Sequence, residues 1–284
     1  MTTITLEEAI NRVPAIGATQ AGVNSETYQF ISTRKVLEKA LENDWEIVGA
    51  SAAGRSAAAQ HRVTLVHRND LAQLQSNPLC EGVPRMELFN SHNMTKRFMV
   101  VAGFFKVACS NGLIISYGPV ESIRTKHRFS DNRLETIMGH IETAAQHFPA
   151  LNGIINNFKQ RELTEEEQLN YAKYAIKGRY LYRKSMPKAF GNLDTMAEKL
   201  VTSVRRQEDE GDGLWQVYNR VQENIVRGIN GSTRPMRGYD DSIRVNRLLW
   251  KGAEKALEYR NNSYNQALDG LLVKANTPVN PRNN

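Results

Sequence analysis

The segment Arg62-Val63-Thr64-Leu65-Val66 is the clearest strand signal in the chain, and it decides the class of fold. A short run of β-branched and aliphatic residues is typical of a strand rather than of a helix. The same character is found in residues 45–48, 86–89, 113–115 and 120–128. We therefore predict an α+β fold, in which the N-terminal half forms a small, mainly antiparallel sheet with helices.

Two helices are expected beside these strands. Thr5-Leu6-Glu7-Glu8 has the form of a capping box, which predicts a short helix that begins there and ends by Pro14. Thr33 is the expected N-cap of a second helix over residues 34–43. Residues 50–59 are rich in Ala, Ser and Gly and are expected to form a mobile loop.

The second half of the chain is predicted to be helical. From Leu134 onward the apolar residues recur with a three–four spacing, and Pro149 is expected either to kink this helix or to begin a new one. Thr164-Glu165-Glu166-Glu167 is a second capping box, which begins a helix that reaches about Arg183. Further helices fit residues 193–206, 214–227 and 240–259.

The change of pattern along the chain predicts three parts. Residues 1–130 form the α+β region that contains the sheet. Residues 131–260 form a helical region packed on it, as one composite domain. Residues 261–284 form a tail that is partly disordered, because from Asn276 onward it is rich in Asn and Pro.

The composition indicates a globular protein with a basic surface. Of the 284 residues, 40% are apolar and 24% are charged. No apolar run approaches the roughly 18–20 residues that span a bilayer, and no export signal is visible, so we expect no membrane partner and a cytoplasmic location, in the host cell if the gene is carried by a phage. Cys80 and Cys109 are then expected to be reduced thiols. The net charge of +7 favours polyanionic partners, nucleic acid first.

Signatures of catalysis are missing from the sequence. It contains no phosphate-binding loop that ends in Lys-Ser/Thr, no dinucleotide-binding fingerprint and no Gly-x-Ser-x-Gly elbow. None of the six histidines has a helical metal spacing with a carboxylate between. We therefore expect no catalytic residue, no metal site and no cofactor.

The strongest physical signal is a basic stretch that begins at Lys173 and runs to Lys188. It contains six cations and no acidic residue: Lys173, Lys177, Arg179, Arg183, Lys184 and Lys188. Such a surface can neutralise phosphates, and Tyr174 and Tyr180 within it can stack on unpaired bases. The alternative is a solvated helix face whose tyrosines pack inward.

Three further groups of cations extend this prediction. One comprises Arg124, Lys126, His127 and Arg128, and another comprises Arg227, Arg234, Arg237 and Arg244. In the third, His92 lies beside Lys96 and Arg97, where it suits either phosphate contact or a local turn. The predicted nucleic-acid-binding residues are Lys173, Tyr174, Lys177, Arg179, Tyr180, Arg183, Lys184, Arg124, Lys126, Arg128, His92, Lys96, Arg97, Arg234 and Arg237.

Two polar segments flank an apolar run, and together they resemble a known family. Asn90-Ser91-His92-Asn93 precedes the run over residues 98–105, and Cys109-Ser110-Asn111-Gly112-Leu113 follows it. The run either pairs back as a strand or forms one helix. With residues 214–224 and 245–250, this pattern resembles the phage, prophage and plasmid family known as domain of unknown function 932. The sequence departs from that family at Asn93-Met94, where Asp-Gly is usual, which weakens any catalytic role for an acid there.

The resemblance implies a protein of a mobile genetic element, encoded near recombination or anti-host genes. Combined with the basic clusters, it predicts a nucleic-acid-binding accessory protein of a phage or plasmid that binds single-stranded DNA, in annealing-type recombination or replication, and that forms a homo-oligomer. One alternative is an antagonist of host defence or restriction that acts by binding a host protein. A second alternative is a metal-dependent nuclease that uses Glu87, Asp240 and Asp241.

Overall fold

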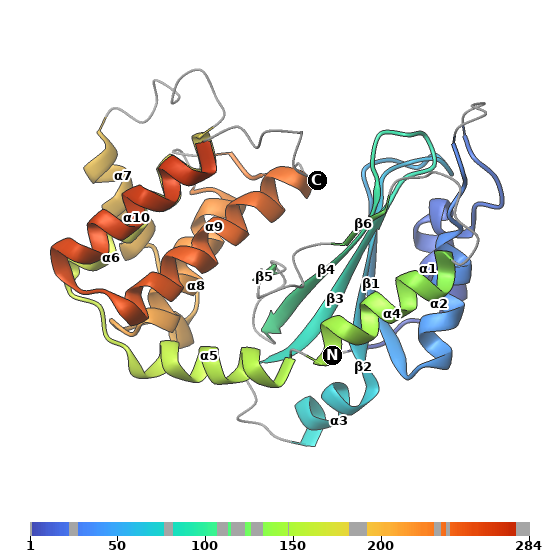
Figure 1. Ribbon diagram of the computed structural model, residues 1–284, viewed down its shortest axis with the longest axis horizontal. Coiled ribbons are helices and arrows are strands. Elements are labelled where there is room, and N and C mark those ends of the chain that lie inside the picture. The colour runs from blue at the N-terminus through green and yellow to red at the C-terminus, as the bar shows by residue number, and fades with distance from the viewer. Residues whose placement is uncertain are drawn as a thin grey trace. The chain divides into compact units, whose positions relative to one another are not determined.

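The computed structural model describes residues 2–22, 28–76, 82–106, 113–114, 123–125, 133–146, 148–181, 192–229, 234–236 and 239–276 (Figure 1). The chain divides into two compact units, a sheet unit over Met1–Pro149 and a helical unit over Ala150–Asn284. Both cysteines and the predicted turn Ser110-Asn111-Gly112 lie outside the described residues. The two units are described separately.

The sheet unit is built on a six-stranded antiparallel sheet with the order β1-β2-β3-β4-β5, in which β6 also pairs with β4. The strands are β1 (Trp45–Ala52), β2 (His61–His67), β3 (Gly82–Asn90), β4 (Phe98–Lys106), β5 (Leu113–Ile114) and β6 (Ile123–Thr125). The first four follow one another along the chain and pair in sequence, while β5 and β6 occupy different parts of the same edge of β4. The predicted α+β fold with an antiparallel N-terminal sheet is confirmed.

The apolar run before residue 106 is a strand, which decides between the two alternatives that its sequence leaves open. In β4, Phe98 and Val100 pack into the core, and Met99 and Val101 are buried on the opposite face. The loop predicted over residues 50–59 is shorter than expected, because β1 continues to Ala52, which pairs with His61. A register shift between Ile47 and Gly49 accompanies this extension.

Three helices cover one face of this sheet. The helices of the unit are α1 (Leu6–Arg12), the 3-10 helix η1 (Pro14–Gly17), α2 (Thr33–Glu42), α3 (Arg68–Ser76) and α4 (Arg133–Gln146). Val63, Leu65 and Leu88 alternate along β2 and β3 and pack with residues of α1, α2 and α4 in one core. On the other face, Leu71 of α3 packs with Val66 and Val83.

Local capping explains where the first helices begin. The capping box at Thr5 is confirmed, since Thr5 Oγ1 accepts from Glu8 N at 3.1 Å and Glu8 Oε2 accepts from Thr5 N at 2.7 Å. The N-cap of α2 is Ser32 rather than Thr33, because Ser32 Oγ accepts from Lys35 N at 3.3 Å. The side chain of Thr33 is used instead in the buried network described below.

The helical unit contains six α-helices among its described residues. They are α5 (Phe148–Gln160), α6 (Glu165–Tyr180), α7 (Leu193–Thr202), α8 (Leu214–Arg227), α9 (Tyr239–Glu258) and α10 (Asn261–Asn276), with the 3-10 helix η4 (Gln207–Asp209) before α8. Pro149 lies in the first turn of α5, so it begins a new helix. The second capping box is also confirmed, because Thr164 and Glu167 bond reciprocally.

Helix α10 corrects the prediction of a tail from residue 261 onward. Tyr264, Leu268 and Leu272 are spaced four residues apart, and they bury one face of α10 against α6 and α9. The Tyr264 hydroxyl also donates to Gly252 O at 3.1 Å. The Asn-rich composition obscured this apolar stripe, while residues 277–284 lie outside the described part.

The division between the units also lies later than residue 130. Helix α4 belongs to the sheet unit, because Ile137, Met138 and Ile141 are part of its core. That the helical region packs on the sheet region as one composite domain stays a prediction.

Candidate nucleic-acid interface

The motif Asn90-Ser91-His92 at the end of β3 is fully buried, and its hydrogen bonds join segments that are distant in the sequence. Asn90 Nδ2 donates to Ile31 O at 3.0 Å and to Thr33 Oγ1 at 2.9 Å, while Asn90 Oδ1 accepts from Ser91 N at 2.8 Å. Ser91 Oγ donates to Lys96 O at 3.0 Å and accepts from Lys96 N at 2.8 Å. We call Thr33, His61, Asn90, Ser91 and His92 the latch.

His92 holds the N-terminal segment against this network. Its Nε2 lies 2.9 Å from Ala15 O, and because a carbonyl oxygen only accepts, Nε2 carries the proton. The main-chain N–H of Gly22 donates to His92 O at 2.7 Å. A Cβ at Gly22 would lie 2.4 Å from the Cβ of Ala58, so this approach requires glycine. The predicted phosphate contact of His92 is therefore corrected to a structural role, because the side chain has no exposed surface.

The hydrogen bonds of His61 fit a neutral ring. Its Nδ1 lies 2.9 Å from Ala59 O and must donate, and in the neutral ring its Nε2 accepts from the Thr33 hydroxyl at 2.8 Å. The Thr33 oxygen in turn accepts from Asn90, which completes a directed chain. A charged His61 would donate to the Thr33 oxygen instead, so the Thr33 hydroxyl proton would lose this acceptor. Burial also lowers the pKa of His61 below its ordinary value of 6.5, although the hydrogen bond to Ala59 opposes this.

The stability of the sheet unit is expected to fall as the pH is lowered below 6.5. In that range the unfolded chain binds a proton at His61 that the folded chain does not, so the free energy of unfolding decreases until the pH passes the lowered folded pKa. Hydrogen–deuterium exchange of the β2 and β3 amides between pH 5 and pH 8, corrected for the pH dependence of the intrinsic exchange rate, measures this slope. His61→Gln is expected to flatten it, and an unchanged slope in that variant would contradict the assignment.

Glu87, one of the acidic residues that a metal-dependent nuclease would use, forms a buried ion pair on the sheet. Glu87 is fully buried, with Oε1 2.8 Å from Arg85 Nη2 and Oε2 accepting from Thr64 Oγ1 at 3.0 Å. Asp240 and Asp241 lie in the first turn of α9, where Asp241 pairs with Arg244 at 3.6 Å. Over the described residues, no group of three or more His, Cys, Asp or Glu side chains is placed to hold a metal ion.

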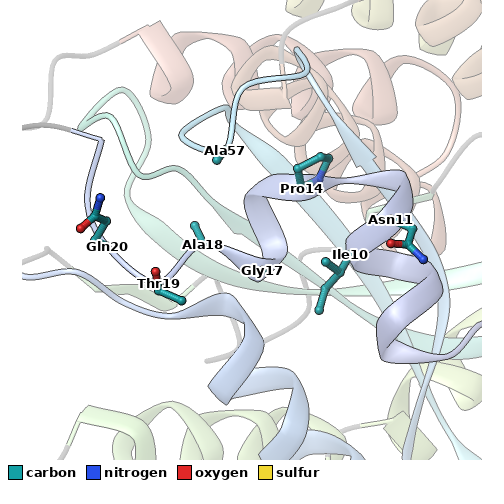
Figure 2. Close-up of a pocket in the computed structure, with 8 residues that line it drawn as sticks. All are labelled: Ile10, Asn11, Pro14, Gly17, Ala18, Thr19, Gln20 and Ala57. Carbon is teal, nitrogen blue, oxygen red and sulfur yellow. The ribbon is translucent and has the colours of Figure 1, made fainter.

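A hollow of about 490 Å³ lies on the N-terminal segment. Figure 2 shows the residues that line it. Its lining consists of Ile10, Asn11, Pro14, Gly17, Ala18, Thr19, Gln20 and Ala57. These residues carry no charge, and the polar ones are amides and a hydroxyl. These lining residues therefore supply no positive charge that would attract a polyanion.

The tyrosines of the basic helix α6 face inward. Tyr174 is 2% exposed and its hydroxyl donates to Leu248 O at 2.7 Å, and Tyr180 is 7% exposed. Burial raises the pKa of Tyr174 above its ordinary value. A Cβ at Gly252 of α9 would lie 2.6 Å from the Tyr174 ring, which shows how closely α9 covers it. Base stacking by Tyr174 and Tyr180 is therefore corrected to core packing.

The cations of α6 lie at its surface, and each has an identified partner. Lys173 Nζ lies 2.5 Å from Asp194 Oδ1, and Lys177 Nζ lies 3.4 Å from Asp269 Oδ1. Arg179 Nη1 donates to Ile225 O at 2.5 Å, and its Nη2 donates to Arg234 O. The exposed pairs contribute little stability, so these lysines can exchange an acid for another anion at small cost.

Two of the predicted basic clusters meet at the C-terminal ends of α6 and α8. Arg179 bridges the end of α8 and the segment that contains Arg234, while Arg244 donates to Gly178 O at 2.6 Å and to Arg179 O at 3.2 Å. Arg205 donates to Asn224 Oδ1 at 3.0 Å and to Gly228 O at 2.6 Å. We call Arg179, Arg205, Arg227, Arg234 and Arg244 the arginine junction.

The junction concentrates positive charge where helix ends are negative. The last carbonyls of a helix carry the negative end of its dipole, which arginine side chains stabilise. Arg205, Arg227 and Arg234 are exposed residues of the junction, and Arg227 is 3.4 Å from Glu223. Arg205 was missed by the sequence analysis, although its neighbour Arg206 makes an Arg-Arg pair just before the acidic segment at 208–212.

Several predicted site residues cannot be placed at this junction. Arg183, Lys184, Lys126, Arg128 and Arg237 lie outside the described residues, and for Arg124 only the backbone of β6 is described. In the sheet unit, Lys96 is 8% exposed and Arg97 is exposed, next to the latch.

The excess of positive charge belongs to the helical unit. Residues 150–284 contain 22 lysines and arginines against 16 aspartates and glutamates, whereas residues 1–149 contain 15 against 14. Six of the seven net charges therefore lie on the unit that carries the arginine junction. Across the described residues, no helix is both long and apolar enough to cross a membrane.

Comparison with known proteins gives a consistent family match. A family model described as "Domain of unknown function (DUF932)" matches residues 20–250. The UPF0380 protein YafZ of Escherichia coli (strain K12) is 28% identical over 279 residues, covering 89% of this chain and 92% of that protein. The UPF0380 protein YfjQ of the same strain is 26% identical over 272 residues, with the same two coverages. No solved structure matches the chain.

Proposed function

The chain belongs to the DUF932 family, as its sequence motifs predicted, and we propose that it is a nucleic-acid-binding accessory protein that contacts DNA through the arginine junction. The observation that carries this proposal is the convergence of two separate basic clusters at the ends of α6 and α8. Guanidinium groups bind phosphate through paired hydrogen bonds, and several of them together release condensed counterions from DNA.

The distribution of charge supports the same surface. The helical unit holds most of the net positive charge, so the long-range field favours approach of a polyanion to this unit. A role in phage or plasmid recombination or replication is part of the proposal and rests on the family resemblance. The single-strand preference expected from the sequence depended on Tyr174 and Tyr180, whose burial removes that support.

Charge reversal at the junction is expected to weaken DNA binding. The double variant combines Arg234→Glu in the junction with Lys177→Glu, at a position two residues before Arg179 on α6. Its affinity should fall at least about tenfold at low salt, and the slope of log affinity against log salt should decrease by about 2. Both side chains reach solvent and the Lys177–Asp269 pair is exposed, so the fold should tolerate the changes. Fluorescence anisotropy with labelled DNA across a salt series measures both quantities.

A matched control distinguishes an effect of the junction on DNA affinity from an effect of the net charge of the protein. Lys35→Glu with Arg55→Glu alters two exposed cations of the sheet unit and changes the net charge by the same amount. This control should bind almost as tightly as the unaltered chain. If both double variants lost the same amount of affinity for DNA, the junction would contribute only as part of a diffuse positive surface. Unchanged affinity in the junction variant would refute the assignment and direct attention to a host protein partner.

A further inference from the structure

We infer that the arginine junction binds the phosphate backbone rather than the bases, so that duplex DNA, single-stranded DNA and inorganic polyphosphate compete for it. This inference rests on the proposed function and specifies the class of ligand at the same surface. It follows, over the part of the helical unit that the structure describes, from the placement of the side chains that could read or stack on a base.

The aromatic side chains of α6 and α8 whose burial the structure describes point into the helical core. Tyr171 donates to Leu249 O at 2.9 Å, as Tyr174 does to Leu248 O, and both rings are buried between α6 and α9. Trp215 and Tyr218 of α8 stack on each other within the same core, with ring centroids 5.7 Å apart. These rings therefore cannot form the stacking platform that single-strand binders use.

Tyr259 is an exposed aromatic residue of the described part of the chain, and it lies far from the junction. It follows the C-terminal end of α9, whereas Arg244 lies near the beginning of that helix. Fifteen residues separate them, which is about 22 Å along a helix. Lys255 also lies over the Tyr259 ring at 5.3 Å.

The side-chain amides of Asn224 and Gln222, near the junction, likewise form hydrogen bonds within the helical unit. Asn224 Nδ2 donates to Leu200 O at 3.1 Å and to Ser203 O at 2.8 Å, and its oxygen accepts from Arg205. Gln222 Nε2 donates to Asn246 Oδ1 at 2.9 Å, and both residues are buried. Base edges are read mainly by such amides and by guanidinium groups that enter a groove, so these amides supply no sequence readout.

The arginines themselves are held in fixed positions by main-chain carbonyls. Arg179 and Arg205 are anchored to α8 at Ile225 O and Gly228 O, and Arg244 is anchored to α6 at Gly178 O. These bonds hold three guanidinium groups at the ends of two packed helices, where their remaining N–H groups can face phosphate oxygens. Because duplex DNA carries a higher linear charge density than a single strand, it should bind at least as tightly.

A competition experiment on the full chain tests this inference. The probes are a labelled oligothymidine, a labelled mixed-sequence strand and a labelled duplex of equal length, each displaced by inorganic polyphosphate. We expect the two single strands to bind within about threefold of each other and no tighter than the duplex, with all three displaced by polyphosphate. Arg234→Glu should weaken all three by the same factor, while the Lys35→Glu, Arg55→Glu control should leave them unchanged.

The outcomes that contradict the inference differ from those that contradict the proposed function. A preference for single strands of more than about tenfold over the duplex, retained in excess polyphosphate, would overturn backbone recognition while Arg234-dependent DNA binding survived. Absence of binding to every probe at low salt would overturn both. If Arg234→Glu disturbs folding, Arg234→Gln provides the same comparison with a smaller change of charge.

Discussion

Replacement of Glu167 by alanine is expected to lower the free energy of unfolding of the helical unit by about 3–5 kcal/mol. Glu167 is 1% exposed, and both of its oxygens lie 2.8 Å from Arg161 Nη2. The same carboxylate accepts from the main-chain N–H groups of Thr164 and Asn261, at 3.1 and 2.8 Å. Without it, a nearly buried guanidinium and two N–H groups lose their partner together.

The pKa of Glu167 indicates how strongly this carboxylate is held. Burial alone would raise the pKa, but hydrogen bonds from Asn261, Arg161 and Thr164 outweigh burial and lower it below 4.5. These contacts join the first turn of α6 to the first residue of α10. The Glu167→Ala variant should therefore loosen α10 as well as α6.

The measurement can be restricted to the helical unit. In a Trp45→Phe background the remaining tryptophans, Trp215 and Trp250, both lie in this unit and report its unfolding in urea. Glu166→Ala is the matched control, because Glu166 occupies the same turn of α6 but is exposed. Glu166→Ala should change the free energy of unfolding of the helical unit by less than about 0.5 kcal/mol. Similar losses in the two variants would show that the buried ion pair is not what stabilises this turn.

Replacement of Asn90 by alanine is expected to destabilise the sheet unit by about 3–5 kcal/mol. The variant leaves Ile31 O, Thr33 Oγ1 and Ser91 N without the partners that the Asn90 side chain supplies. Each is buried, and an unsatisfied buried polar group costs about 1–3 kcal/mol. Without Asn90, the Thr33 hydroxyl also loses the hydrogen bond that holds it in position against His61.

Hydrogen–deuterium exchange locates this effect along the chain. In Asn90→Ala the amides of β2 and β3 should exchange faster, while those of α8 should exchange as in the unaltered protein. Asn69→Ala is the control, because Asn69 lies exposed on α3 in the same unit. Unaltered protection of β2 and β3 in Asn90→Ala would contradict the structural role of the latch.

Local sequence patterns predicted most of the secondary structure. The capping boxes at Thr5 and Thr164 begin helices as expected, and the predicted helix over residues 214–227 coincides with α8. These signals depend on neighbours within one or two turns, so they can be read without the rest of the chain. Helix α3 was not predicted from the sequence. Two other exceptions, α10 and the extension of β1 to Ala52, depend on partners that are distant in the sequence.

The sequence by itself determined the charge of this protein, its α+β class and its family, because these depend on residue types and short motifs. Only the tertiary structure decided which side chains face the solvent. Helix α6 packs against α7, α8, α9 and α10, so it has no continuous polar face and its tyrosines are covered. The structure also brought arginines that lie up to 65 residues apart to the ends of two helices, where carbonyl groups attract them. Such convergence depends on how helices cross, which no local pattern in the sequence encodes.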